Sequence, residues 1–341
     1  MSESVLSIAG SSIERRAILQ ASEISRFERM LEIRGFELRL NELFASGAIH
    51  GTTHLAMGQE ALAVGLACEL EPTDLVTGTY RGHALALALG MSPRSVLSEI
   101  MGKAEGSTGG LGGSMHVSDM AIGLLPTFAI IGAGLPVSAG AALAFQYRNE
   151  PSVSVAVFGD GATNIGAFHE SLNLAAIWNL PVVFLCDNNV YGEYSRINLT
   201  TPIEDLHLRA ASYDMPAVVV DGMRLRAVRE ALAGAVERAR TGGGPTLVEA
   251  KTYRFAGHSR ADTAPYRPEG ELEYWKHRDP ILLAREELVD AGVSRDELER
   301  LESTVEAGLD LIVDTVRALP DPVIGDMFAN VWTPAAGKAG S

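Results

Sequence analysis

The sequence predicts an α/β protein with a doubly wound, mainly parallel sheet. At the centre of the chain, an apolar run at 153–158 is followed by a helical pattern at 164–179 and a second apolar run at 182–186. This strand–helix–strand order implies parallel strands joined by a right-handed crossover. Glycine is also in excess, at 35 of 341 residues, which indicates tight turns and the close backbone approaches that a phosphate-bearing ligand needs.

The alternation of strand and helix patterns continues on both sides of this central unit. A short strand is expected at 75–79, and a helix at 225–240 separates two further strand patterns at 217–220 and 246–253. Parallel strands that alternate with helices form one sheet covered on both faces. These patterns therefore extend the same sheet in both directions.

Helical patterns flank the expected sheet. From Ile24 to Ser46, apolar residues recur at helical spacing, and Gly47 stands where a helix C-cap belongs. From residue 280 onward the pattern is again helical, and Ser294 with Glu297 predicts a capping box. The expected organisation is an N-terminal tail at 1–23, an α/β domain at 24–278, and a C-terminal helical segment with a tail at 279–341.

Composition and charge exclude several classes of protein. With 28 basic and 43 acidic residues the net charge is −15, so a nucleic-acid groove is not expected. Cys68 and Cys186 fit neither a disulfide framework nor a zinc site, and the N-terminus shows no secretory signal, so we expect a cytoplasmic location. The uncharged stretch at 120–147 is broken by prolines and glycines, so we expect it to be buried core and not a membrane span.

Two polar residues stand where neighbouring strands are expected to end. Asp160 follows the strand at 153–158 within Gly-Asp-Gly, and Asn189 follows the strand at 182–186. Ligands bind at the carboxyl edge of such sheets, and carboxylate and amide oxygens suit Mg²⁺, which recruits phosphate oxygens to complete its shell. Either motif alone is more typical of a plain turn, but the two together at this spacing strongly favour a metal–diphosphate site.

The segment from Gly159-Asp160-Gly161 to Asn188-Asn189 closely resembles the signature of thiamine diphosphate enzymes. From about residue 24 to 322 the chain resembles the alpha subunit of the decarboxylating component of 2-oxo acid dehydrogenase complexes, in the pyruvate and acetoin branches. The resemblance implies the thiamine-diphosphate-binding fold. It also rests on segments in family order at 54–60, 79–83, 112–116, 220–223, 253–254, 257–259 and 278–280.

The resemblance assigns cofactor-binding roles residue by residue. It implies that Asp160, Asn189 and the carbonyl of Tyr191 hold Mg²⁺, and that thiamine diphosphate lies against a larger set of residues. Arginines suit a diphosphate because the guanidinium is always charged and presents forked donors. The residues implied to contact the cofactor are Tyr80, Arg81, Ala129, Ile131, Asp160, Gly161, Ala162, Asn189, Tyr191, Arg254 and His258.

Two histidines are expected to act on the substrate. His258 lies in a polar loop after Arg254, and His54 lies in a turn bounded by glycines. An imidazole titrates near neutrality and can donate a proton to a developing alkoxide or carboxylate. The resemblance implies that both histidines reach the substrate side of the cofactor, so both are assigned to substrate handling and proton transfer.

The resemblance also implies partner chains. Thiamine catalysis needs a carboxylate against the pyrimidine ring, and past residue 278 only helices and a tail are expected, so we expect a beta subunit to supply this glutamate in an α2β2 heterotetramer. The implied activity is that of a 2-oxo acid or acetoin dehydrogenase that passes an acyl group to a lipoyl acyltransferase. Two alternatives stay open: a two-subunit carboligase or transketolase-like enzyme, and a non-catalytic nucleotide-binding protein.

Overall fold

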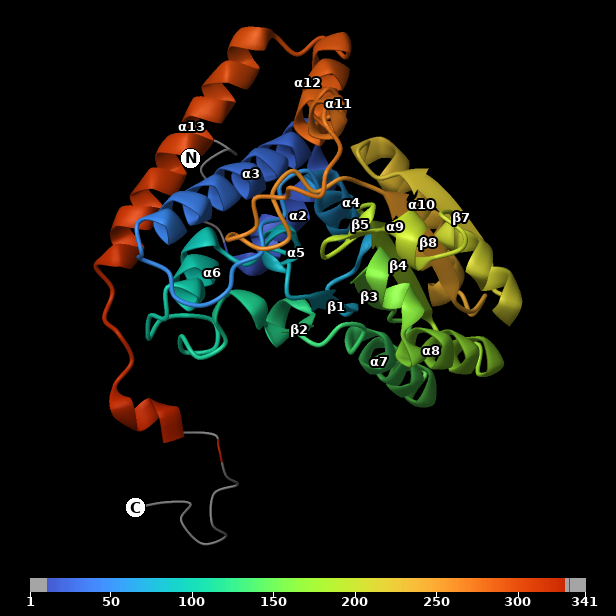
Figure 1. Cartoon of the computed structure of the whole chain (residues 1–341). Coiled ribbons are helices and arrows are strands. Elements are labelled where there is room, and N and C mark those ends of the chain that lie inside the picture. Colours follow the sequence, from blue (N-terminus) through green and yellow to red (C-terminus); the bar gives the residue numbers. More distant parts are fainter. Residues whose placement is uncertain (1–10, 329–330, 332–341) are drawn as a thin grey trace, which may run out of the picture.

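The computed structural model describes residues 11–328 and residue 331, and its centre is a six-stranded sheet (Figure 1). All neighbouring strands pair in parallel, in the order β2-β1-β3-β4-β8-β7. The expected doubly wound parallel sheet is therefore confirmed. Its strands are β1 (Leu75–Thr79), β2 (Leu124–Phe128), β3 (Ser154–Gly159), β4 (Val182–Asn188), β7 (Ala217–Asp221) and β8 (Thr246–Lys251).

Helices cover both faces of the sheet because alternate strand residues point to opposite sides. In β4, Val183 and Leu185 join one buried apolar cluster, whereas Val182, Phe184 and Cys186 join another. The helices that contribute to the first cluster include α2 (Ser12–Ala21), α3 (Glu23–Ala45), α4 (Glu60–Glu69), α5 (His83–Ala88), α6 (Pro93–Ile100) and α10 (Leu225–Arg240). The second cluster includes α7 (Gly134–Arg148), α8 (Gly166–Ile177) and the 3₁₀ helix η4 (Leu206–Tyr213).

Shorter elements and C-terminal helices complete the fold. The helices α12 (Pro280–Asp290) and α13 (Arg295–Arg317) pack against α3, as expected for a C-terminal helical segment. Ser294 caps α13 by accepting a bond from the Glu297 amide, which is one of the two bonds of the expected capping box. The remaining elements are η1 (Gly113–Met115), η2 (Met120–Ile122), η3 (Asp160–Asn164), β5 (Tyr191–Gly192), β6 (Ser195–Arg196), α9 (Ile197–Thr200), α11 (Glu271–Lys276) and η5 (Ile324–Phe328).

The N-terminal segment differs from the sequence prediction. Residues 1–23 were expected to be a tail, but residues 12–21 of this segment form α2, which packs against α3 and α4. A capping box between Ser11 and Glu14 starts the helix, and Arg15 is fully buried in an ion pair with Glu32 at 2.6 Å. The part of the tail before residue 11 lies outside the described residues, and the domain boundaries stay a prediction.

The uncharged stretch at 120–147 is only partly core. It forms β2 and most of α7, and α7 buries Leu135, Ala142 and Phe145 but exposes Val137 and Leu143. The expectation that the whole stretch is buried was therefore wrong for one side of α7. One side of this helix packs against the sheet, and its other side is exposed to solvent. Among the described helices, none combines the length and apolar character needed to cross a bilayer.

Candidate cofactor-binding site

The predicted site residues come together in one cavity at the carboxyl edge of the sheet. Gly159 pairs with Asp187 across β3 and β4, so Asp160 and Asn189 emerge side by side at the ends of neighbouring strands. The cavity has a volume of about 520 Å³. It is lined by all twelve predicted site residues: His54, Tyr80, Arg81, Ala129, Ile131, Asp160, Gly161, Ala162, Asn189, Tyr191, Arg254 and His258.

Two buried oxygens in this cavity lack partners. Asp160 is 3% exposed and Asn189 is 8% exposed, and the Oδ1 atom of each has no hydrogen-bond partner within the described part of the chain. A buried polar atom without a partner costs free energy, so native structures normally provide one. A carboxylate oxygen and an amide oxygen are ligands that Mg²⁺ accepts, and the two therefore fit a divalent cation.

The electrostatics of this corner also favour a cation. Burial and the neighbouring Asp187 raise the pKa of Asp160 to about 7, against the lowering effect of the Asn189 amide and of Arg254. Burial likewise raises the pKa of Asp187 to about 6, although bonds from Thr252 and Gln59 lower it. Two buried carboxylates side by side ionise reluctantly, and a bound cation stabilises both in their charged form.

Other residues that line the same cavity are suited to an anion. A Cβ atom at Gly161 would lie 3.3 Å from the Cα of Gly192, so a side chain there would crowd the neighbouring turn. Arg254 is 2% exposed, and its Nη2 donates to the Glu193 carbonyl at 3.2 Å and to the Tyr266 hydroxyl at 3.1 Å. Its Nε atom is buried without a partner, which leaves a charged donor for a diphosphate oxygen.

His54, His258 and Tyr80 form a cluster of contacting rings in the wall of the cavity. The ring centroids of His54 and His258 are 5.1 Å apart, and the Tyr80 ring lies 4.3 Å from His54 and 5.7 Å from His258. Burial and the positive charge of Arg81 lower the pKa of His54 to about 3 and that of His258 to about 4. The expectation that they titrate near neutrality was therefore wrong, since burial and a neighbouring cation disfavour the imidazolium.

Arg81 binds backbone in this structure. Its Nη1 donates to the Leu55 carbonyl and its Nη2 to the His258 carbonyl at 2.8 Å, so it ties the two histidine-bearing loops together. The predicted contact between Arg81 and the cofactor stays a prediction. The hydrogen bonds of Arg81 also position the loops that carry His54 and His258, which the sequence did not indicate.

Some residues around the site were missed by sequence reasoning. Gln59 donates to Asp187 at 2.6 Å, and Tyr266 donates to Asp262 at 2.6 Å in the loop that carries His258. Asp262 also accepts the His258 amide at 2.6 Å, which fixes the start of that loop. A signal existed for Asp187, because it directly precedes the Asn188-Asn189 pair, but the contacts of Tyr266 and Asp262 follow only from the folded loop.

Fold and site together define a class of protein: an α/β protein whose sheet edge is suited to a divalent cation beside a phosphate-bearing ligand. The chain belongs to the dehydrogenase E1 component family, whose model matches residues 28–323. It is 40% identical over 323 residues to the alpha subunit of acetoin:2,6-dichlorophenolindophenol oxidoreductase from Bacillus subtilis (strain 168), covering 94% of this chain and 96% of that protein.

Two further relatives show similar coverage. The acetoin:2,6-dichlorophenolindophenol oxidoreductase alpha subunit of Cupriavidus necator is 41% identical over 308 residues, which is 90% of this chain and 92% of that protein. The pyruvate dehydrogenase E1 component alpha subunit of Porphyra purpurea is 40% identical over 309 residues, covering 88% of this chain and 90% of that protein. The family resemblance predicted from the sequence is therefore confirmed.

Proposed function

We propose that this chain is the alpha subunit of a thiamine-diphosphate-dependent 2-oxo acid or acetoin dehydrogenase that uses Mg²⁺. The observation that carries the proposal is the pair of buried, unpartnered oxygens on Asp160 and Asn189 in a chain of the E1 family. Relatives named as acetoin and pyruvate dehydrogenase alpha subunits support the two candidate substrates about equally, at 40–41% identity.

In this proposal the chain holds the diphosphate end of the cofactor. Asp160, Asn189 and the Tyr191 carbonyl would bind the cation, and Gly161 with Arg254 would face the diphosphate. Tyr191 is 3% exposed, and its hydroxyl donates to Glu271 at 2.6 Å, which fixes the short turn that carries its carbonyl. When bound, thiamine diphosphate provides a nucleophilic carbon and accepts the electron pair left after carbon–carbon cleavage.

The two histidines would handle the substrate. With pKa values this low both are neutral at pH 7, and a neutral imidazole offers one donor and one acceptor nitrogen. A substrate carboxylate bound beside both rings would favour their protonated forms and raise both pKa values. His258 is then suited to move a proton at the substrate oxygen, and His54 to orient the substrate through a hydrogen bond.

The proposed assembly is an α2β2 heterotetramer. The names of the relatives as alpha subunits imply a beta subunit. We propose that this partner supplies the glutamate at the pyrimidine ring and that a lipoyl acyltransferase accepts the acyl group. We also propose that the complex is cytoplasmic.

The test is an assay of the chain co-expressed with its beta subunit. Reduction of an artificial acceptor is measured with pyruvate, branched 2-oxo acids and acetoin, each with and without thiamine diphosphate and Mg²⁺. The proposal predicts turnover of at least one of these substrates that depends on both cofactors. Absence of turnover with every substrate, despite an intact complex, would contradict it.

A variant of His258 tests the assigned role directly. His258→Ala removes the proton-transfer group but none of the proposed cation ligands, so we expect turnover to fall about a hundredfold or more with little change in cofactor affinity. Turnover is measured by the acceptor assay and affinity by calorimetry. Full activity in His258→Ala, or loss of cofactor binding, would contradict the role.

A further inference from the structure

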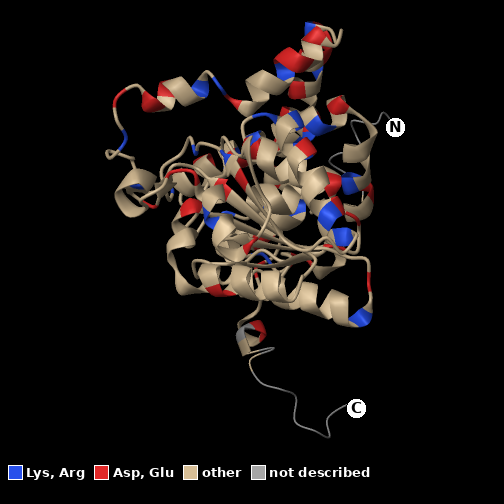
Figure 2. Cartoon of the chain, turned by 90° about the vertical axis from the view of Figure 1, so that its right-hand side faces the viewer, with Lys and Arg blue, Asp and Glu red and all other residues tan. Residues whose placement is uncertain are grey.

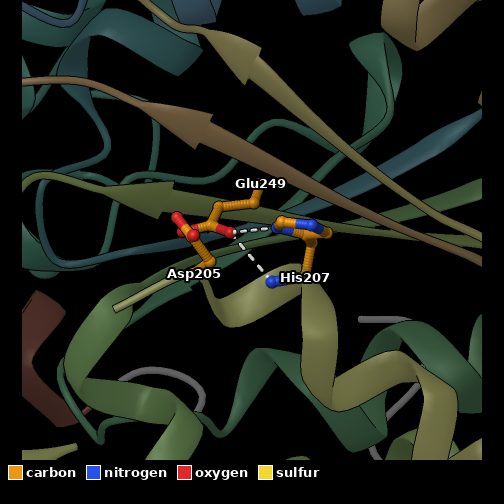
Figure 3. Close-up of side chains that lie close together, drawn as sticks. All are labelled: Asp205, His207 and Glu249. Atoms are coloured by element: carbon orange, nitrogen blue, oxygen red, sulfur yellow. Dashed lines mark hydrogen bonds and ion pairs between the residues drawn. The ribbon is translucent and has the colours of Figure 1, made fainter. Parts of the chain in front are cut away.

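A second polar cluster is formed by Asp205, His207 and Glu249, on the face of the sheet covered by η4 (Figure 3). Glu249 in β8 is fully buried, and its Oε2 accepts bonds from the backbone amide of His207 at 2.8 Å and from its Nδ1 at 3.0 Å. Asp205 lies beside them, and suitable atoms of the three side chains are within 4.8 Å of one another.

This cluster already contains a cation of its own. The ammonium of Lys251 lies 2.7 Å from Glu249 and 3.1 Å from Asp205, between the two carboxylates. A metal ion would have to displace this ammonium and break the bond between His207 and Glu249. The cluster is therefore not suited to a metal. Its role is sought instead in the hydrogen bond that Glu249 accepts from Asn188.

Glu249 is hydrogen-bonded to Asn188, which shapes the turn that carries the proposed cation ligands Asn189 and Tyr191. Its Oε1 accepts a 2.6 Å bond from Asn188 Nδ2, and Asn188 is 2% exposed. The Oδ1 atom of Asn188 in turn accepts the amide of Val190 at 3.2 Å. The Asn188 side chain thus bridges a buried carboxylate and the backbone of the turn.

That backbone adopts a conformation that needs support. Val190 has φ +75°, in the left-handed region, where a β-branched residue is strained by about 1–3 kcal/mol. Asn189 and Tyr191 flank Val190, so this conformation sets the direction of both the Asn189 side chain and the Tyr191 carbonyl. A rotation at Val190 would separate these two proposed ligands.

We propose that Glu249 is a positioning residue for the cation: it orients Asn188, which holds Val190 in its left-handed conformation and so directs Asn189 and Tyr191 at one ion. The proposal rests on the proposed function, because it takes the cation site as given. It concerns geometry and not the charge of Glu249, since Lys251 already neutralises that charge.

Two substitutions separate geometry from charge. Glu249→Asp keeps the charge but shortens the side chain, so the carboxylate can no longer reach Asn188 and His207 together. Glu249→Gln loses the charge but keeps the length and an acceptor oxygen for Asn188. In the α2β2 complex, stripped of metal and saturated with thiamine diphosphate, Mg²⁺ affinity is measured by calorimetry.

We expect Glu249→Asp to weaken Mg²⁺ about tenfold or more, as loss of a supporting contact does at other metal sites, and Glu249→Gln to stay within about threefold. Asp205→Asn is the matched control: Asp205 is 60% exposed in its side chain and reaches the cluster through Lys251, so affinity should not change. Wild-type affinity in Glu249→Asp, or an equal loss in Glu249→Gln, would overturn the proposal.

A comparison of two ions distinguishes positioning from general destabilisation. Mg²⁺ demands near-ideal octahedral geometry, whereas Ca²⁺ tolerates irregular ligand sets. Glu249→Asp should therefore lose more affinity for Mg²⁺ than for Ca²⁺, whereas a partly unfolded protein would lose both by the same factor, which would overturn the proposal. If the wild-type complex binds no Mg²⁺, the proposed function fails as well; if only the variant results disagree, the role of Glu249 fails alone.

Discussion

Burial sets the protonation of His54 and His258, the two histidines proposed to act on the substrate. His54 is 5% exposed and His258 is partly buried, and both lie near Arg81, so the neutral imidazole is favoured in each. The sequence placed these histidines correctly in one cavity, because each lies in a recognisable motif. Their pKa values could not be predicted from the sequence, since they depend on burial and on the Arg81 guanidinium, which come near these rings only in the folded chain.

The lowered pKa values of His54 and His258 predict how the protonation of these two side chains depends on pH. In the metal- and cofactor-free complex, their ring signals should stay those of neutral imidazole down to about pH 5, because the folded pKa values are about 3 and 4 against 6.5 for an unperturbed histidine. NMR of ¹³C-labelled histidine measures this, with His54→Asn and His258→Asn to assign the signals.

The lowered pKa values of His54 and His258 also determine how the stability of the fold changes with pH. Between about pH 4 and 6.5 the unfolded chain binds protons at these positions that the folded chain does not, so stability should rise with pH across this window. Replacing His258 by asparagine removes one of the two groups and should flatten the rise. Midpoints near 6.5 for both signals would contradict the account.

One buried side chain organises a glycine-rich segment. Glu99 in α6 accepts bonds from the amides of Thr108, Gly110, Gly112 and Gly113 at 2.7–3.0 Å. Although burial raises the pKa of Glu99, these bonds lower it overall. The sequence indicated that the segment at 106–113 is irregular, but not that a carboxylate from the preceding helix satisfies its backbone.

Glu99→Gln tests this arrangement. A glutamine offers one acceptor oxygen in place of two, which leaves amides unpaired, so we expect a loss of about 3 kcal/mol in the free energy of unfolding, measured with urea. Because the pKa of Glu99 is lowered in the fold, its contribution is present above about pH 4.5 and is lost as the pH falls through the folded value.

Glu105→Gln is the control for Glu99. Glu105 pairs with Arg94 at the surface, where both side chains are nearly half exposed, so its loss should cost less than about 0.5 kcal/mol. Similar losses in the two variants would show that the bonds to the glycine-rich segment do not stabilise the fold.

Elements with strong periodicity were predictable from the sequence. The strand at 75–79 and the helix at 225–240 match β1 and α10, because their patterns are long or sharply bounded. The helix α2 was missed although Ser11 and Glu14 form a capping box. Two of its buried residues are arginines, so its buried face does not show an apolar pattern in the sequence. Arginine reads as a surface residue in sequence, and only the ion pair with Glu32 explains its burial.

At the scale of the molecule, α7 and α8 lie below the sheet in the view of Figure 1, and both helices expose large apolar side chains. Neither helix carries more than one acidic or basic residue, Arg148 and Glu170 respectively, and Figure 2 shows few charged residues in this part of the molecule. Exposed apolar residues that gather on one surface are typical of protein–protein interfaces. The exposed apolar side chains are Val137, Leu143, Tyr147, Leu174, Ile177 and Trp178, which are 39–87% exposed.

We predict that partner chains of the proposed α2β2 assembly cover this α7–α8 surface. Ile177→Asp should weaken assembly by about 2 kcal/mol or more, because a charge would be buried at the interface. Analytical ultracentrifugation of the co-expressed complex measures this. Leu311→Glu is the control, since Leu311 is 69% exposed on α13, away from this surface, and an intact heterotetramer is expected. Normal assembly of Ile177→Asp would contradict the prediction.

The sequence also predicted a beta-subunit partner, and relatives named as alpha subunits imply such a partner. The α7–α8 surface was not predicted, because an uncharged stretch looks the same whether it is covered by its own chain or by another. The convergence of Asp160 and Asn189, by contrast, followed from strand order alone.

The central claim is that Asp160 and Asn189 hold one divalent cation that anchors a diphosphate. Calorimetric titration of thiamine diphosphate into the α2β2 complex tests it most directly, with wild type and Asp160→Ala, each with Mg²⁺ and with a chelator. The account predicts tight binding to the wild type only when Mg²⁺ is present, and no measurable binding to Asp160→Ala. Wild-type affinity in Asp160→Ala, or equal affinity with the chelator, would contradict it.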